Sequence, residues 1–517
     1  MRSVRLRVLA STAALITAGA GAWSLLPERE ETAGSVTVGT SDQVISLDPA
    51  GAHDAGSWAL HGNLFQSLLT FRPGEVEPVP DAASRCDFIG PELRTYQCEL
   101  RPGLTFPSGR TVTGADVKHS IDRVRTIRAK VGPAALFAGL DAVEANGRTV
   151  TFRLARPDAT FPYRIATAAG SIVDSTRYPA DALRTGDRAD GSGHYTLTSY
   201  RPGSAAKLSP NVRYRGAVPA GGRPVVLRYY ADPEALDAAW RGRQIDVAAR
   251  QLPPAALAAL RPSATDHRLS EAASAETRNL VLNVRPGSGL ADRQVRRAVA
   301  AVLDREALAA VTYRGTVTPL YSLIPRGIHG HTTSFFDEYP EVDVRRARKL
   351  LRDAGVEVPL AFHYGHARGS SAADEAAEVK RQLEATGLFR MRITAYEWGE
   401  FRRTYAEGRL DAYAVSWVPD YPDPDTYTAQ LVGSGAIVRN GYAEPEAQRL
   451  VRDAQRFEDR AGAAGALRAL QTVVARDVPV IPLWQRKEYV LTRAGITGGQ
   501  YLTDGTGLLR LWTLARV

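Results

Sequence analysis

The last third of the chain alternates between strand-like and helix-like segments, and this alternation constrains the fold more than any other sequence feature. Three of the segments have the composition of strands, and the two between them have helical spacing. In chain order they are residues 360–364, 372–386, 392–396, 400–407 and 411–417. Strands that alternate with helices predict a mixed or parallel sheet covered by helices.

The preceding part of the chain adds further strands and helices. Residues 36–40 alternate like a strand, residues 54–69 have helical spacing, and β structure is predicted over residues 72–101. Thr113 is a good N-cap for a helix whose first turn contains Asp116. The remaining predictions are a hairpin over 191–210, strands over 225–230 and 279–284, and helices over 233–241, 292–311 and 344–354. A chain of 517 residues is long enough for two or three domains with well-buried cores.

The N-terminus has the pattern of a secretion signal. Three arginines lie within the first seven residues, and residues 8–26 carry no charge. The uncharged stretch is also about long enough to cross a bilayer, so we expect residues 1–26 to be a signal peptide or a retained membrane anchor. Residues 27–34 are interpreted as a linker. A second hydrophobic span is absent from the sequence, which excludes a permease.

The net charge of +9 raises the question of nucleic-acid binding. The basic residues are mostly arginines spread along the whole chain, whereas a nucleic-acid binder is expected to cluster them on one stripe or arm. We therefore expect no nucleic-acid partner.

The chain contains two cysteines, Cys86 and Cys98. Two cysteines in an exported chain usually pair, because the compartment is oxidising. The segment between them has a Gly-Pro turn flanked by strand-like residues, so a hairpin would bring the cysteines together. The alternative is a pair of unpaired buried thiols.

Several motifs occur in the order and spacing of a known family. They are LDP at 47–49, NLFQSLL at 63–69, FPSGRTVTGADV at 106–117, GSGHY at 191–195, VRRA at 295–298, DR at 304–305, YEWGEF at 396–401 and WVPDYPDPD at 417–425. Together they resemble the extracellular solute-binding proteins of family 5, the dipeptide, oligopeptide and nickel group. Pro107-Ser108 stands where the family usually has Ser-Asp, and His194 stands at a position that is usually Pro.

The resemblance implies an α/β, two-lobed periplasmic-binding-protein-like fold with an additional small β-rich domain. By analogy, lobe I comprises residues 35–70, 188–278 and 480–517, the additional domain residues 71–187, and lobe II residues 279–479. Two crossings near residues 278 and 479 would form a hinge. Cys86 and Cys98 would then join a hairpin in the additional domain.

The resemblance also implies a function. The chain would be the substrate-binding component of an ABC importer at the extracytoplasmic face of the cell membrane, and it would deliver short peptides to permease subunits with cytoplasmic ATPases. We expect a monomer that needs no cofactor and associates with the membrane through its N-terminus or the transporter. The same carrier role for an oligosaccharide or a metal chelate is the main alternative.

Asp420 is the predicted anchor for the amino terminus of a peptide. A buried ammonium group needs a counter-charge, and Asp420 follows the predicted strand 411–417 at the family position for this role. The alternative is an ordinary turn aspartate. Asp423 and Asp425, in the same turn, are interpreted as capping residues.

Other side chains are predicted to complete the binding site. Trp398 and Trp417 would line side-chain pockets, unless both are core tryptophans, and Tyr421 is a weaker wall candidate. Arg368 is the candidate partner of the ligand carboxylate, because a bidentate arginine suits that group. In so arginine-rich a chain, Arg368 is otherwise expected to be an exposed surface residue.

Metal binding and catalysis are less well supported. The close histidine pairs are His329 with His331 and His363 with His366, and loop histidines at such spacings are more often solvated or hydrogen-bonded than metal ligands. The sequence lacks a G-x-S-x-G elbow, an H-E-x-x-H motif and a phosphate-binding loop. We therefore expect neither a metal site nor an enzyme, although a secreted hydrolase with paired carboxylates is the competing class.

Overall fold

A computed structural model describes residues 34–218, 220–250, 252–261, 264–503, 506 and 508–517. The predicted signal or anchor, residues 1–26, and all but the last residue of the linker lie outside the described residues. Within the described part, no helix is long and apolar enough to cross a membrane.

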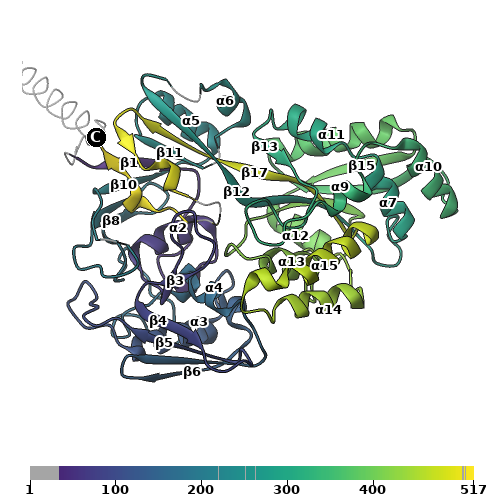
Figure 1. Ribbon diagram of the computed structural model, residues 1–517. Helices are drawn as coiled ribbons and strands as arrows, with labels where there is room; N and C mark the ends of the chain where they lie inside the picture. Colours follow the sequence, from purple (N-terminus) through teal and green to yellow (C-terminus); the bar gives the residue numbers. More distant parts are fainter. Residues whose placement is uncertain (1–33, 219, 251, 262–263, 504–505, 507) are drawn as a thin grey trace, which may run out of the picture. The chain divides into compact units, whose positions relative to one another are not determined.

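A single large mixed sheet runs through the molecule (Figure 1). Its strands lie in the order β15, β14, β16, β12, β17, β11, β1, β10, β9 and β8, and β13 also pairs with β17. Their bounds are β1 Val36–Thr40, β8 Tyr195–Arg201, β9 Ala205–Pro210, β10 Val225–Tyr229, β11 Val247–Ala249, β12 His267–Leu282, β13 Val317–Pro319, β14 Leu360–Ala367, β15 Phe389–Tyr396, β16 Ala412–Trp417 and β17 Val480–Arg493. Parallel and antiparallel pairs both occur, which confirms the predicted mixed α/β class.

Two long antiparallel strands, β12 and β17, lie side by side in the middle of this sheet (Figure 1). Their pairing runs from His267 with Arg493 to Val281 with Val480. The register shifts between Ala273 and Thr277, where β12 bulges. A bulge redirects side chains out of the regular alternation of a strand.

A separate four-stranded antiparallel sheet has the order β4, β5, β7 and β6. Its strands are β4 Ala83–Phe88, β5 Thr95–Leu100, β6 Leu140–Asn146 and β7 Thr149–Leu154. Two-stranded ladders elsewhere are β2 Leu69–Thr70 with β3 Val79–Pro80, and β18 Ile496–Thr497 with β19 Ala515–Arg516. Cys86 and Cys98 face each other across β4 and β5 and form a disulfide, as predicted.

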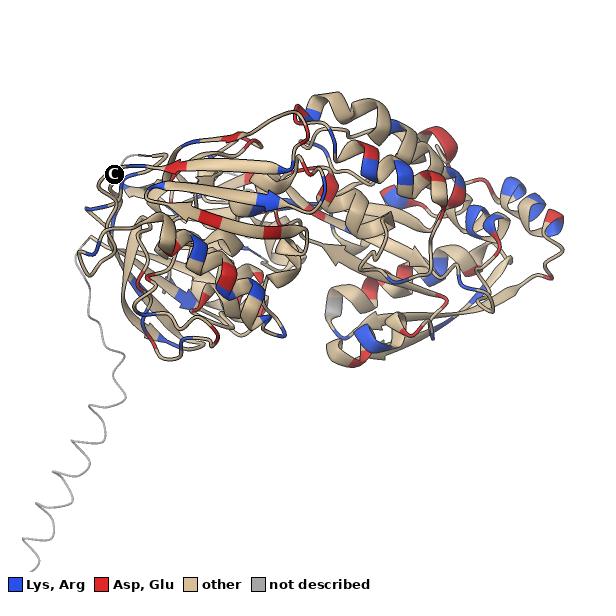
Figure 2. Ribbon diagram, turned by 90° about the horizontal axis from the view of Figure 1, so that it is seen from below, with Lys and Arg blue, Asp and Glu red and all other residues tan. Residues whose placement is uncertain are grey.

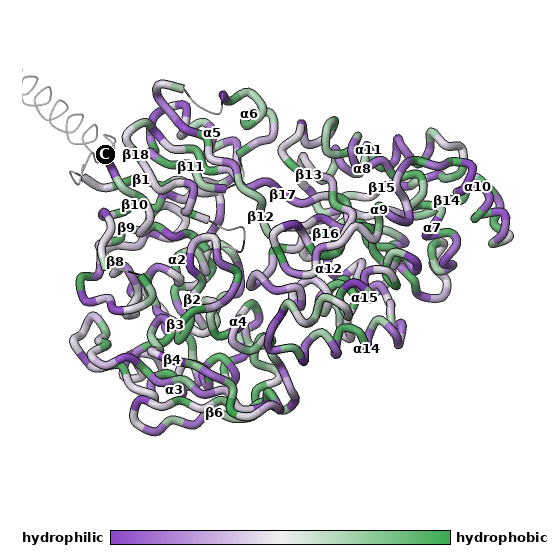
Figure 3. The backbone as a smooth tube through the Cα atoms, viewed as in Figure 1, coloured by the Kyte–Doolittle hydropathy of each residue, from purple (hydrophilic) through white to green (hydrophobic). Residues whose placement is uncertain are grey.

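Helices cover the sheets. They are α2 Ala55–Leu64, α3 Gly114–Ile127, α4 Phe161–Ile165, α5 Pro233–Arg241, α6 Pro254–Ala259, α7 Arg293–Ala301, α8 Arg305–Ala307, α9 Ser334–Glu338, α10 Val344–Asp353, α11 Ser370–Ala385, α12 Trp398–Ala406, α13 Asp425–Val432, α14 Pro445–Ala454 and α15 Ala464–Asp477. α10 shows why they pack as they do: Ala347, Leu350 and Leu351 are buried, and its arginines face outward. Figure 3 shows the corresponding mixture of hydrophilic and hydrophobic residues along this helix.

Buried apolar residues gather into three main cores. The largest contains residues from 280 to 484 only. The second spans residues 50–172 and also includes Tyr421, and the third combines residues from 36–65, 173–249 and 490–514. A smaller cluster lies around α5 and α6.

Two predicted helices differ from the structure. The stretch 54–69 is helical only to Leu64, because Phe65 adopts an extended conformation at the helix C-terminus. The predicted helix 292–311 is broken after Ala301, and Asp304 caps a new short helix that continues as one π turn, Leu308–Thr312. The side-chain cap at Asp304 competes with the continuous helix that the apolar spacing favoured.

Charged residues of both signs are interspersed along the described chain (Figure 2). Many form ion pairs with each other, including the fully buried pair of Arg123 with Asp48.

Candidate functional site

Asp420 lies in the loop that connects β16 to α13. Its Oδ1 atom is 2.6 Å from Nε2 of His53, a residue that precedes α2 at the other end of the chain. The side chain of Asp420 is 12% exposed and that of His53 is 29% exposed. The structure therefore brings the predicted anchor against a titratable partner that the sequence analysis did not identify.

His53 is held in place on both sides. Its ring stacks on Trp58 with the centroids 4.8 Å apart, and the neighbouring Asp54 caps α2 by accepting a hydrogen bond from the backbone N–H of Ser57. Burial lowers the pKa of His53, but the hydrogen bond and charge of Asp420, assisted by Asp54, raise the pKa above its usual value. An imidazolium at this position neutralises Asp420, so the carboxylate already holds a cation where a ligand ammonium would bind.

The loop around Asp420 is fixed by a buried ion pair. Nε and Nη2 of Arg460 lie 2.6 and 3.0 Å from the two carboxylate oxygens of Asp423, and both side chains are inaccessible to solvent. Asp423 also accepts a hydrogen bond from the backbone N–H of Asp425. Asp423 is therefore not the N-cap that the sequence predicted, since Pro424 occupies that position in α13; its carboxylate instead fixes the turn through Arg460 and the backbone N–H of Asp425.

Tyr421 points into the protein rather than toward solvent. It is 3% exposed and belongs to the core of residues 50–172, where its ring lies 6.0 Å from that of Tyr163. Nε of Arg164 donates to its hydroxyl group over 3.4 Å. In this conformation Tyr421 connects the loop after β16 to the α4 segment. Its ring is buried in that core and does not face solvent.

The two predicted tryptophans have different environments. Trp398, the first residue of α12, is 60% exposed, so it is not a core residue. Trp417 ends β16 and packs partly against the largest core, and no described residue accepts a hydrogen bond from its buried Nε1. A buried indole N–H without a partner among the described residues is uncommon in folded proteins.

Arg368 lies on the surface after β14. Its Nε atom is 2.7 Å from Glu397, and both side chains are exposed. An exposed pair of this kind contributes little to stability, so it leaves Arg368 able to exchange partners. Among the described residues, no hydrogen bond or ion pair joins Arg368 to Asp420.

A cavity of about 480 Å³ lies beside the two long strands. We call it the crossing-strand pocket. Its walls come from the start of α5, Arg250, residues within 252–257, Glu276 and Arg278 of β12, Tyr313, Thr316, the first turn of α11, Ser416 of β16, and Trp484 with residues 486–489 of β17. None of the five predicted binding residues lines it, although Ser416 directly precedes Trp417.

The pocket is unusually rich in charge for the middle of a sheet. Four cations line it, and each has a carboxylate partner: Arg250 with Asp42 at 3.2 Å, Arg278 with Glu375 at 2.8 Å, Arg486 with Glu276 at 2.5 Å, and Lys487 with Glu271 at 3.1 Å. The sequence signal that could have indicated this site is the presence of charged residues within β12 and β17. That these residues line one pocket depends on the pairing of the two strands.

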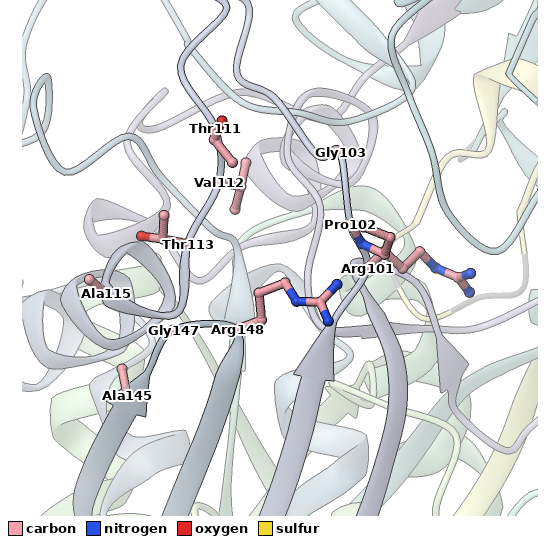
Figure 4. A pocket seen from close by; sticks show the side chains of 10 residues that line it. All are labelled: Arg101, Pro102, Gly103, Thr111, Val112, Thr113, Ala115, Ala145, Gly147 and Arg148. Carbon is pink, nitrogen blue, oxygen red and sulfur yellow. The ribbon is translucent and has the colours of Figure 1, made fainter.

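A second cavity, of about 340 Å³, lies in the region of the four-stranded sheet. Figure 4 shows its walls, formed by the loop after β5, the entry to α3 and the turn between β6 and β7. Its two cations are engaged, because Arg101 donates to the backbone oxygen of Asp81 and Arg148 pairs with Glu99. No predicted binding residue lines this cavity.

Three of the four paired histidines make local hydrogen bonds. His331 bonds to the backbone oxygen of Ile324, His363 to Thr394, and His366 to the backbone oxygen of Ala367. Among the residues that the structure describes, no group of three or more His, Cys, Asp or Glu side chains has the arrangement of a metal site.

The model of Bacterial extracellular solute-binding proteins, family 5 Middle, matches residues 77–438. Di/tripeptide-binding protein 3 of Pseudomonas aeruginosa (strain UCBPP-PA14) is 24% identical over 465 residues, which cover 81% of this chain and 83% of the relative. The Dipeptide-binding protein of Escherichia coli (strain K12) is 24% identical over 484 residues, which cover 86% of this chain and 87% of the relative.

A solved structure shares the fold. The ABC transporter-associated periplasmic binding protein DppA from Helicobacter pylori, in complex with the peptide STSA, superposes with a TM-score of 0.79 at 21% identity, and the match covers 93% of this chain and 98% of the other. The fold is thus that of the two-lobed periplasmic binding proteins. The chain belongs to family 5 of the bacterial extracellular solute-binding proteins.

Proposed function

We propose that this solute-binding protein captures short peptides and delivers them to the permease of an ABC importer. The observation that carries the proposal is the position of Asp420, a largely buried carboxylate held by a rigid loop and paired with a replaceable histidine. The names of the relatives support it, since they are di- and tripeptide-binding proteins. A solved neighbour bound to a tetrapeptide supports it as well.

Asp420 has the chemistry that a peptide amino terminus requires. A buried ammonium group without a counter-charge costs several kcal/mol, and a carboxylate with a fixed position removes that cost. Trp417, which is partly buried, and Trp398, whose ring is exposed, would line pockets for the side chains of the ligand. Arg368, whose partner Glu397 is exposed, is the candidate for the ligand carboxylate.

The proposed mechanism is closure of two lobes around the ligand. Lobe I would contain residues 35–70, 188–278 and 480–517, and lobe II residues 279–479, with residues 71–187 as the additional domain. The hinge would lie in β12 and β17. The buried members of the largest core begin at residue 280, which supports a boundary near residue 279, and they extend to residue 484, a few residues beyond the second proposed boundary. Ligand contacts made only in the closed form would shift the population toward it.

The cellular role follows from the family. A carrier of this type acts outside the cytoplasm, as a monomer that docks on permease subunits and leaves the peptide intact. The membrane tether would be the N-terminal segment or the transporter itself.

Isothermal titration with alanine peptides of two to five residues tests the proposal. We expect saturable binding in the micromolar range, which corresponds to about 8 kcal/mol. Chromatography of the mixture afterwards should return the peptide unchanged. New product peaks would identify a hydrolase instead, and absence of binding to every peptide, after removal of any co-purified ligand by unfolding and refolding, would refute the proposal.

A further inference from the structure

The crossing-strand pocket contains one buried carboxylate that the ion pairs do not use. Glu488 of β17 lines the pocket and is 7% exposed. Its Oε1 atom is shielded from solvent, and no described residue donates a hydrogen bond to it. A buried carboxylate oxygen without a donor is costly, so its presence calls for an explanation.

The charges around Glu488 leave negative charge in excess. The four cations of the pocket each have their own carboxylate, as described above. Two lining carboxylates, Glu488 and the exposed Glu234, take part in none of the ion pairs found among the described residues. Carboxylates thus outnumber cations around the pocket, so a cation is the group that would balance its charge.

The local backbone explains why Glu488 remains without a partner. At the bulge in β12, Glu276 is directed toward Arg486 and binds it through both carboxylate oxygens. Arg486 lies two residues before Glu488 on the same face of β17, so the nearest guanidinium on that strand is already engaged. Burial raises the pKa of Glu488 even though Arg250 and Arg486 lower it, which agrees with a site that is short of a cation.

We propose that the crossing-strand pocket binds a cationic group of the ligand, a primary ammonium or a guanidinium, through Glu488. This inference rests on the proposed function for the source of that group, which would be a lysine or arginine side chain of a bound peptide. The cavity of about 480 Å³ is large enough for such a side chain.

The position of the pocket agrees with a peptide anchored at Asp420. Ser416 lines the pocket, and it precedes Asp420 by four residues. Four residues of fully extended chain span at most about 13–14 Å, which a peptide of about four residues also spans. A peptide whose amino terminus meets Asp420 thus brings its second, third or fourth side chain within reach of the pocket.

Matched peptides test the inference by isothermal titration. In a tetra-alanine background, each of positions two to four is replaced in turn by lysine, by arginine or by norleucine, which resembles lysine but carries no charge. At one position we expect lysine and arginine to bind at least tenfold more tightly than norleucine. Glu488→Gln should abolish this preference while leaving the affinity for tetra-alanine within about twofold, and Glu234→Gln, on the exposed rim, is the matched control that should retain it.

The outcomes separate this inference from the proposed function. Two results would show that the pocket is not a cation site although the protein still carries peptides. In the first, alanine peptides bind but the wild-type protein does not prefer lysine or arginine at any position. In the second, Glu488→Gln keeps that preference. If no peptide binds, cadaverine and agmatine serve as free probes: binding that Glu488→Gln abolishes supports the cation site alone, and no binding overturns both proposals. Thermal unfolding of both variants should match or exceed that of the wild type, since neither substitution removes an ion pair.

Discussion

Replacement of Asp420 by asparagine tests the proposed anchor most directly. Asparagine preserves the size of the side chain but removes the charge that would meet the ligand ammonium. A hydrogen bond to a charged group contributes about 1.5–3 kcal/mol. The Asp420→Asn variant should therefore bind a free-amino peptide about 10- to 150-fold more weakly at pH 6.5.

The contact between Asp420 and His53 makes this loss depend on pH. The pKa of His53 is raised above its usual value, so below pH 6.5 the imidazolium form predominates and pairs with Asp420. A ligand ammonium must displace it, and the released proton makes binding weaker as the pH falls. For one linked proton the limiting change is about tenfold per pH unit, so wild-type affinity should rise severalfold, and at most about tenfold, from pH 5.5 to 6.5.

Isothermal titration in buffers of different ionisation enthalpy measures both effects. It gives the dissociation constant and the number of protons released on binding. His53→Gln is the matched control: it cannot titrate, so its affinity should be nearly independent of pH between 5.5 and 6.5 and should exceed that of the wild type at pH 5.5. Asp420→Asn should likewise lose the proton release.

Two results would refute this reasoning. Unchanged affinity in Asp420→Asn, with the fold intact by circular dichroism, would show that Asp420 does not hold the ligand amine. If His53→Gln kept the wild-type pH dependence, another group would be responsible for the linkage. Measurements stay below pH 7, because the peptide amino group itself loses its proton near pH 7.7–8.0.

Three further predictions concern stability. The disulfide between Cys86 and Cys98 closes a short loop, so replacing both by serine should lower the free energy of unfolding by about 3 kcal/mol in urea titrations, whereas peptide affinity should not change. Arg460→Met leaves Asp423 buried without its partner and should cost about 3–5 kcal/mol in the same assay; a change below 1 kcal/mol would contradict the buried pair. The pKa of His53 is raised on folding, so protonated His53 should contribute fully to the free energy of unfolding below pH 6.5, and this contribution should be lost as the pH rises through the folded-state pKa. His53→Gln should show no such loss when urea midpoints at pH 5.5 and 8.5 are compared.

Local signals in the sequence were sufficient for many of the elements. Helix α5 has the predicted bounds, because Asp232 caps it, Pro233 suits its first turn and Arg241 ends it before a glycine. Helix α3 begins after Thr113, as predicted, and Asp116 in its first turn accepts a hydrogen bond from the backbone N–H of Thr113. In each case the physical cause, a cap or a proline, acts within a few residues of its effect, and the same holds for the hairpin of the disulfide.

The arrangement of the site could not be obtained in this way. His53 and Asp420 are 367 positions apart, and nothing in either local sequence indicates that they meet. The sequence does not distinguish Glu488 from other charged strand residues. Glu488 has no ion-pair partner among the described residues, because the bulge in β12 directs Glu276 toward Arg486. Which carboxylates keep a partner and which are left for a ligand depends on strand register and on packing between distant segments, because electrostatic pairing requires proximity in space rather than in sequence.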